Sequence, residues 1–448
     1  MSSRDYAGGD SSPRHQGSPL PRVVGLTGAV LMGLGSILGA GIFVSVGIAA
    51  GAAGPSVLLT VALAAAVAAF NGFSSAQLAA SHPVSGGAYE YGYRYLNPAL
   101  GFTAGWMFLC AKAASAATAA LGLAGYVLTS FGGEGRLLRI LLGAAIVAAV
   151  TSLAAGGMRR SSRTNAIMVL FTLFALTAFV LIGAPTAIVN GALWFSPFLA
   201  FDADGVNALL HGTALMFVAY TGYGRIATLG EEIRSPARNI PRAIFTTLIV
   251  TMILYASVAA VSVGAIGAEA LSAAAQATAA PLEAVTEGLG VPWIGWLVAG
   301  AAITSMVGVL LNLLLGLSRV ILAMGRRGDL PNWLARVDYR QKSPRRAVIL
   351  TGALIIGLVL IGKVRITWSF SAFTVLVYYA LTNLAALRLP ARKRRLPRLI
   401  PFLGLLSCLG LAFWVEPMIW MAGLGLIALG LAWHFFAASG SRHSPRGS

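Results

Sequence analysis

The feature that most constrains the fold is a series of long apolar stretches that recurs along nearly the whole chain. A helix needs about 20 apolar residues to cross the hydrocarbon core of a bilayer. Apolar residues make up 57% of the 448 positions and charged residues only 10%, and no soluble domain of ordinary size fits between the apolar stretches. We therefore predict an all-α integral membrane protein. Its expected transmembrane helices, about twelve by the length that a bilayer requires, lie at 24–50, 56–80, 99–130, 137–157, 164–184, 206–231, 242–266, 293–323, 347–362, 366–389, 399–415 and 417–436.

The basic residues predict the orientation of these helices. Twenty-six of the 32 Lys and Arg residues fall in the tails and in the loops on one side, and only four fall on the other side. Cytoplasmic loops are enriched in Lys and Arg, so both termini are expected in the cytoplasm of a multi-pass plasma or inner membrane protein. Residues 1–21 are predicted to be a disordered cytoplasmic tail, 22–436 the membrane domain and 437–448 a second cytoplasmic tail.

Several classes of function are not expected. The net charge of +18 does not indicate nucleic-acid binding, because the basic residues mark loops and are not interleaved with aromatic residues. Cys110 and Cys408 fall inside apolar stretches and are predicted to be buried free thiols. No His/Glu metal cluster and no nucleophile–base pair is apparent, so neither an enzyme nor a bound metal or cofactor is predicted.

Glycines interrupt the first and the sixth predicted spans near the middle of the bilayer. Gly39 and Gly41 flank Ala40 in the first span, and Gly222 and Gly224 lie in the sixth. Small residues also permit close helix packing, but glycines at this depth let a helix unwind and free backbone groups that need partners. Two interrupted helices five spans apart predict a transporter of two inverted five-helix repeats, the LeuT-type fold. The repeats are expected over about 22–184 and 206–390, with extra helices over 399–436.

Five segments, in the same order, resemble the amino acid–polyamine–organocation family of permeases. The resemblance implies a secondary active transporter that moves amino acids by alternating access, with the lipid bilayer as its surroundings. It also implies that the loop 81–98 and the stretch 231–242 are cytoplasmic gating elements. The segments are SILGAGIF (36–43), HPVSGGAYEYGYRYLNPALGFTAGW (82–106), AYTGYGRIATLGEEIRSPARNIPRAI (219–244), LSRVILAMGRRGDLPNWLA (317–335) and SAFTVLVYYALTNLAALRLP (371–390).

The same resemblance assigns the substrate site to backbone groups at the two interruptions. The N–H groups of the first interruption would hold the substrate carboxylate, and carbonyl groups from both would take its ammonium. The residues implied are Gly39, Ala40 and Gly41 for the carboxylate and Ile37, Val218, Ala219 and Thr221 for the ammonium.

One departure from the family pattern leaves the coupling ion open between a proton, sodium and none. Proton-coupled members carry a lysine in the fifth span, where Thr172 aligns here. The eighth-span hydroxyls of sodium-using relatives align near Gly308 and Val309, with Thr304 and Ser305 out of register. An exchanger or facilitator without ion coupling therefore remains an alternative, as does a ligand-sensing membrane protein of the same fold.

A second departure is two cations inside the spans, Lys112 and Arg225, without an acidic residue at the same depth. Ionisable groups inside a membrane are costly and often functional. If both line the substrate site, they favour neutral or acidic amino acids over cationic ones. The alternative is that Arg225 extends to Glu231 or Glu232 near the membrane surface and that Lys112 caps a backbone break. The connection 266–292 is expected to be either a surface helix or gate, or a plain linker.

Overall fold

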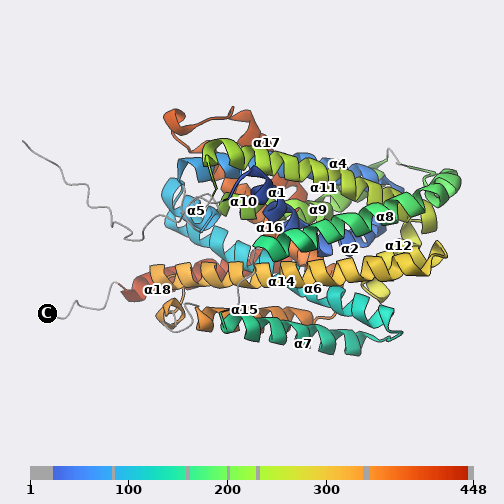
Figure 1. Cartoon of the computed structure of the whole chain (residues 1–448). Helices are drawn as coiled ribbons and strands as arrows, with labels where there is room; N and C mark the ends of the chain where they lie inside the picture. The colour runs from blue at the N-terminus through green and yellow to red at the C-terminus, as the bar shows by residue number, and fades with distance from the viewer. Residues whose placement is uncertain are drawn as a thin grey trace, which may run out of the picture.

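The computed structural model describes residues 24–82, 86–157, 162–198, 202–228, 233–336 and 344–441. Nearly all of these residues are helical, and the helices pack side by side in one bundle (Figure 1). The predicted tail 1–21 and residues 442–448 lie outside the described part of the chain. The α-helices are α1 (Leu26–Ile37), α2 (Ala40–Phe43), α3 (Ser45–Ala53), α4 (Val57–Ser81), α5 (Ala88–Tyr95), α6 (Pro98–Ser130), α7 (Arg136–Ala155), α8 (Ser162–Trp194), α9 (Ala203–Tyr220), α10 (Gly224–Thr228), α11 (Pro236–Ile266), α12 (Ala268–Ala277), α13 (Pro281–Gly288), α14 (Pro292–Arg327), α15 (Arg345–Val359), α16 (Val364–Leu387), α17 (Leu399–Ala412) and α18 (Pro417–Ser441). Four short 3₁₀ helices join them: η1 (Gly54–Ser56), η2 (Thr221–Tyr223), η3 (Asn332–Ala335) and η4 (Ala391–Lys393).

The prediction of an integral membrane protein is confirmed. Among the described residues, eight helical segments are long and apolar enough to cross a bilayer, and two shorter apolar helices, α1 and α17, accompany them. Large apolar side chains such as Leu141, Ile167 and Phe174 are exposed on the outside of the bundle, where a lipid environment accepts them.

The centre of the bundle is occupied by α6, which packs against α14 and α16. Its middle is a run of small residues, among them Ala113, Ala116 and Ala117, and nearly all of them are buried. Small side chains let neighbouring helix backbones approach closely. By contrast, α7 and α18 lie at the periphery of the bundle and bury only a minor share of their residues.

The helix at the fifth predicted span is longer than expected, because α8 continues past Pro185 to Trp194. Proline removes one backbone hydrogen bond, and for this reason the span was predicted to end at residue 184. Membrane helices nevertheless tolerate proline where neighbouring helices support the backbone. Here Gly264 of α11 provides that support, since a Cβ at this position would lie 2.7 Å from the Cβ of Ala187.

The connection 266–292 is not an extended linker, because it folds into α12 and α13. We call this segment, residues 268–288, the cap. It lies close against α3 and α6: a Cβ at Gly47 would lie 2.8 Å from the Cβ of Ala275. Gly125 of α6 is similarly close to the carbonyl of Thr278. The glycines of α3 and α6 therefore provide the surface on which the cap rests.

Candidate functional site

The first predicted interruption is present in the structure. The helix α1 ends at Ile37, Leu38 and Gly39 are extended, and α2 begins at Ala40. The first N–H groups of a helix have no partner within it, and Gly39, Ala40 and Gly41 lie at this helix start. The backbone at the predicted carboxylate position is therefore broken where the glycines indicated.

The second interruption is milder than the first. After α9 ends at Tyr220, the turn η2 continues with helical φ and ψ angles at Thr221 and Gly224, and α10 follows directly. The sixth predicted span therefore tightens into one turn of 3₁₀ helix and does not become extended. A 3₁₀ turn inside a helix changes the direction of the carbonyl groups around it, and such stretches are often functional.

The two interruptions lie against each other. A Cβ at Gly222 would overlap the carbonyl oxygen of Ser36, and one at Gly41 would lie 3.0 Å from the Cβ of Ala219. Both positions need glycine for this close approach. Segments about 180 residues apart in sequence thus form one junction.

Tyr255 of α11 connects two of the four carbonyls predicted to take the substrate ammonium. Its hydroxyl lies 3.1 Å from the carbonyl oxygen of Ile37 and 3.3 Å from that of Ala219. A single O–H has one proton, so it cannot fully satisfy both acceptors. Tyr255 was not identified from the sequence; the available signal was a tyrosine inside an apolar stretch, because a phenol there needs a hydrogen-bond partner.

The other two predicted carbonyls already have partners in the protein. The carbonyl of Val218 accepts a hydrogen bond from the Thr221 hydroxyl at 2.8 Å. The carbonyl of Thr221 lies 3.4 Å from the hydroxyl of Tyr379 on α16. Of the predicted set, Ile37 and Ala219 therefore have the greater capacity for another donor.

Lys112 of α6 reaches the second interruption. Its ammonium nitrogen donates to the hydroxyl of Thr221 at 2.8 Å, and the residue is only 8% exposed. No carboxylate of the described residues lies within ion-pair distance of it. The contact agrees both with a role at the substrate site and with capping of the backbone break. Arg225 lies on α10 and is half-buried, whereas Glu231 and Glu232 lie outside the described residues.

The residues aligned with ion-coupling positions make contacts within their own helices. The Thr172 hydroxyl on α8 donates to the carbonyl of Met168 at 2.8 Å, and those of Thr304 and Ser305 donate to carbonyls of α14. Val309 brings a methyl group to the first interruption, 2.8 Å from where a Gly39 Cβ would lie.

A small cavity borders the second interruption on one side. It lies among α4, α5, α10 and α16, and Gly224 and Tyr379 place it beside the junction. Its lining residues are Ser75, Gly87, Ala88, Tyr91, Gly224, Tyr378, Tyr379 and Thr382. The helix α5 belongs to the predicted gating loop 81–98, of which 83–85 lie outside the described residues. The cavity therefore connects one predicted gating element with the junction.

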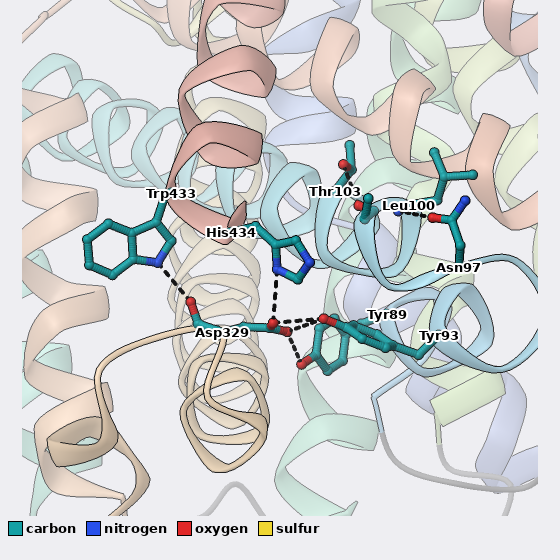
Figure 2. A network of polar contacts seen from close by, with 9 residues as sticks. Tyr89, Tyr93, Asn97, Leu100, Thr103, Asp329, Trp433 and His434 are labelled. Carbon is teal, nitrogen blue, oxygen red and sulfur yellow. Dashed lines mark hydrogen bonds and ion pairs between the residues drawn. The ribbon is translucent and has the colours of Figure 1, made fainter. Parts of the chain in front are cut away.

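A buried polar cluster fixes α5 to the end of α14 and to α18 (Figure 2). The carboxylate of Asp329 accepts hydrogen bonds from Tyr89 at 2.6 Å and from Tyr93 at 2.7 Å. His434 lies 3.3 Å from it, and Trp433 donates to the Asp329 carbonyl at 2.9 Å. We call these five residues the Asp329 cluster. This aspartate belongs to the segment LSRVILAMGRRGDLPNWLA, but no role for it was predicted from the sequence.

The electrostatics of the Asp329 cluster favour the contact between α5 and the end of α14. Burial and the hydrogen bond to Asp329 raise the pKa of the Tyr89 and Tyr93 phenols, so both remain protonated donors. Arg327 lies 4.0 Å above the ring of Tyr93 and pairs with Glu90 of α5 at 2.7 Å. Cation–π contact and ion pairing thus add to the hydrogen bonds.

One family model and several known proteins are similar to the chain along most of its length. Residues 24–446 match the model described as amino acid permease. The chain is 40% identical to an uncharacterized transporter of Mycobacterium tuberculosis over 420 residues, which cover 94% of this chain and 92% of that protein. It is 29% identical to the branched-chain amino acid permease BcaP of Bacillus subtilis over 421 residues, 87% of each chain. It is 26% identical to the mitochondrial cationic amino acid transporter 3 of Arabidopsis thaliana over 363 residues, 78% of this chain and 59% of that one.

Proposed function

The chain belongs to the amino acid permease family, and we propose that it is a secondary active transporter that moves amino acids across the membrane by alternating access. The family match confirms the resemblance found in the five sequence segments. The contact between the two interrupted spans is the observation that carries the proposal. Gly222 lies against Ser36, and the Tyr255 hydroxyl lies between the carbonyls of Ile37 and Ala219.

We further propose the full LeuT-type arrangement, with twelve spans and both termini in the cytoplasm. Each of the twelve ranges predicted from the sequence contains helix in the structure, which supports this count. The positive-inside rule supports the orientation, because the loop that contains α5 and the end of α14 carry Arg94, Arg326 and Arg327. In this orientation the cap faces outward and the Asp329 cluster faces the cytoplasm.

The proposed substrate is a neutral or acidic amino acid. A carboxylate fits the N–H groups of Gly39, Ala40 and Gly41, and an ammonium fits the carbonyls of Ile37 and Ala219. Lys112 at the second interruption would repel a cationic side chain, because charges interact strongly at low dielectric. One similar protein is named for branched-chain amino acids and another for cationic amino acids. Of these two substrate classes, the positive charge of Lys112 favours branched-chain amino acids for this chain.

An exchanger or facilitator without ion coupling is the second candidate. Thr172 cannot titrate near neutral pH, and its hydroxyl already donates within α8. Val309 has no hydroxyl, and by the family resemblance it lies near the position where sodium-using relatives carry one. These two residues favour transport driven by the amino acid gradient.

The test begins with purified protein and all common amino acids. A ligand that binds only the folded state raises the thermal midpoint by mass action. We expect stabilisation by neutral or acidic amino acids, followed by their uptake into proteoliposomes. Uptake under proton, sodium and exchange conditions then separates the two candidates. If no amino acid stabilises the protein or enters the liposomes, the proposed function is wrong.

A further inference from the structure

Glu283 is a buried carboxylate at the contact between the cap and α6. The residue is 6% exposed, although it lies on the short helix α13 between two membrane spans. The Ser130 hydroxyl at the end of α6 donates to its Oε1 atom at 2.6 Å. Its Oε2 atom is buried and has no hydrogen-bond partner among the described residues. A carboxylate in such a position is costly when charged.

The groups around Glu283 provide no compensating cation. From α6, Thr129 faces the carboxyl, but its hydroxyl donates to the carbonyl of Gly125 at 3.0 Å. Tyr126, also of α6, donates to the carbonyl of Phe43 at 2.9 Å and faces the same carboxyl. Glu287, on α13 itself, adds a like charge.

The other elements packed against α13 bring no positive charge to this position. The charged residue of α12 is Glu269, and α3 has none. The cations of α11 and α14 lie at the far ends of those helices: Arg238, Arg242, Arg319, Arg326 and Arg327. The side chain of Arg139 on α7 donates to the carbonyl of Ala277 in the cap and makes no ion pair with Glu283.

We propose that Glu283 is a proton-binding site that controls how tightly the cap closes on α3 and α6. The proton-dependent closing of the cap does not depend on the proposed function. Its consequence, that external pH regulates access to the substrate site, rests on that function. When Glu283 is protonated, the buried charge is removed and the Ser130 hydroxyl still donates to Oε1. When it is ionised, the unpaired oxygen favours a cap that opens and lets water reach the carboxylate.

The direction of the pH effect follows from proton linkage. Burial raises the pKa of the docked Glu283 carboxyl from 4.5 to about 7. Between these two pH values the closed cap holds a proton that the open cap has lost. Each pH unit in this window therefore favours opening by up to about tenfold. Below the window both states are protonated and above it both are ionised, so the equilibrium becomes flat.

Cysteine labelling of the purified full-length protein tests this proposal without requiring transport. Ser272 of α12 is buried against Gly51 of α3, so Ser272→Cys reacts with a soluble thiol reagent only when the cap opens. Ala273 is exposed on the same helix, and Ala273→Cys corrects for the pH dependence of the thiol itself. The chain without an added cysteine gives the background from Cys110 and Cys408.

With Glu283 present, we expect the corrected labelling rate at position 272 to rise roughly tenfold or more between pH 5.5 and pH 8. Glu283→Gln should keep the rate low at both pH values, whereas Glu287→Gln, at an exposed position of the same helix, should keep the rise. Ser130→Ala removes a hydrogen bond that favours the charged form, so it should move the rise to higher pH. A rate that does not change with pH, or a rise that persists in Glu283→Gln, overturns the proposal. Neither result depends on uptake, so it is distinct from failure of the proposed function.

Discussion

The ammonium nitrogen of Lys112 lies 2.8 Å from the hydroxyl oxygen of Thr221, the first residue of the turn η2 between α9 and α10. This contact joins the central helix α6 to the junction of the two interruptions. A second cation 4 Å away would be repelled by about 4 kcal/mol at the effective dielectric typical of a partly hydrated site. The position of Lys112 is therefore expected to influence which amino acids enter.

The first prediction is that Lys112→Met weakens the exclusion of cationic amino acids. In the unsubstituted protein, arginine and lysine should compete poorly with alanine, serine and glutamate for uptake. In Lys112→Met, the ratio between the concentrations of cationic and of neutral or acidic amino acids needed for equal competition should fall by about tenfold or more. This change corresponds to only about 1.4 kcal/mol of the repulsion. Competition of unlabelled amino acids against a labelled substrate gives the ratio directly.

The control is Lys363→Met, which removes the same charge from an exposed position on a loop and should leave the competition order unchanged. Arg225→Met tests the second cation in the same assay, and relaxed selectivity is expected there too. If arginine or lysine outcompetes the neutral amino acids in the unsubstituted protein, Lys112 caps the backbone break and does not select substrate.

The second prediction is that Gly41→Val abolishes uptake while expression stays near normal. A Cβ at Gly41 would lie 2.7 Å from the Tyr255 hydroxyl oxygen and 3.0 Å from the Ala219 Cβ. The valine would separate the two interruptions and block the approach of a substrate carboxylate to the backbone. Uptake per unit of protein in the membrane measures the effect.

Gly316→Val is the matched control, because a Cβ there meets nothing within 4 Å. Both variants introduce a β-branched residue into a helical segment, so general loss of helix propensity affects them alike. Uptake by Gly41→Val at the level of Gly316→Val would remove the backbone site from the proposed mechanism.

The sequence predicted the helices well, because each span leaves a strong signal of apolar length. It also located the first interruption, since two glycines around Ala40 at mid-bilayer depth favour an unwound backbone. The continuation of α8 past Pro185 was missed, because its support comes from Gly264, about 80 residues away. Local rules for proline cannot include such a contact.

The contacts around the proposed site could be anticipated only in part, for a related reason. Backbone carbonyls at Ile37 and Ala219 followed from the family resemblance, but their common partner Tyr255 comes from a different helix. The Asp329 cluster likewise joins three helices that are distant in sequence. A single chain shows which residues are unusual for a membrane span, but tertiary packing decides which of them meet.

The third prediction is that Thr172→Ala leaves the pH profile of transport unchanged. The Thr172 hydroxyl is buried and donates to Met168 within the same helix, and threonine does not titrate in the accessible range. Initial uptake rates between pH 5 and pH 8 should show the same midpoint in both proteins. A shifted or lost optimum would mean that the fifth span takes part in proton coupling after all.

The fourth prediction concerns Asp329, which is 5% exposed and accepts hydrogen bonds from two phenols. Asp329→Asn replaces one acceptor oxygen by an NH₂ donor that faces other donors. The loss of a charge-assisted hydrogen bond and the unpaired buried group together should reduce stability by about 2–3 kcal/mol. Tyr93→Phe removes a single donor and should cost about half as much. Thermal midpoints of the purified variants measure this series.

Two results decide this prediction: the order of the variants by thermal midpoint, and the helix in which hydrogen exchange increases first. Glu269→Gln changes a carboxylate at an exposed position of the cap and should not alter the midpoint. In Asp329→Asn, hydrogen exchange should increase first in α5, because the cluster and the Arg327–Glu90 pair are what hold that helix against α14 and α18. If α5 keeps its protection while the midpoint falls, the cluster stabilises the bundle in general and does not hold the proposed gating helix.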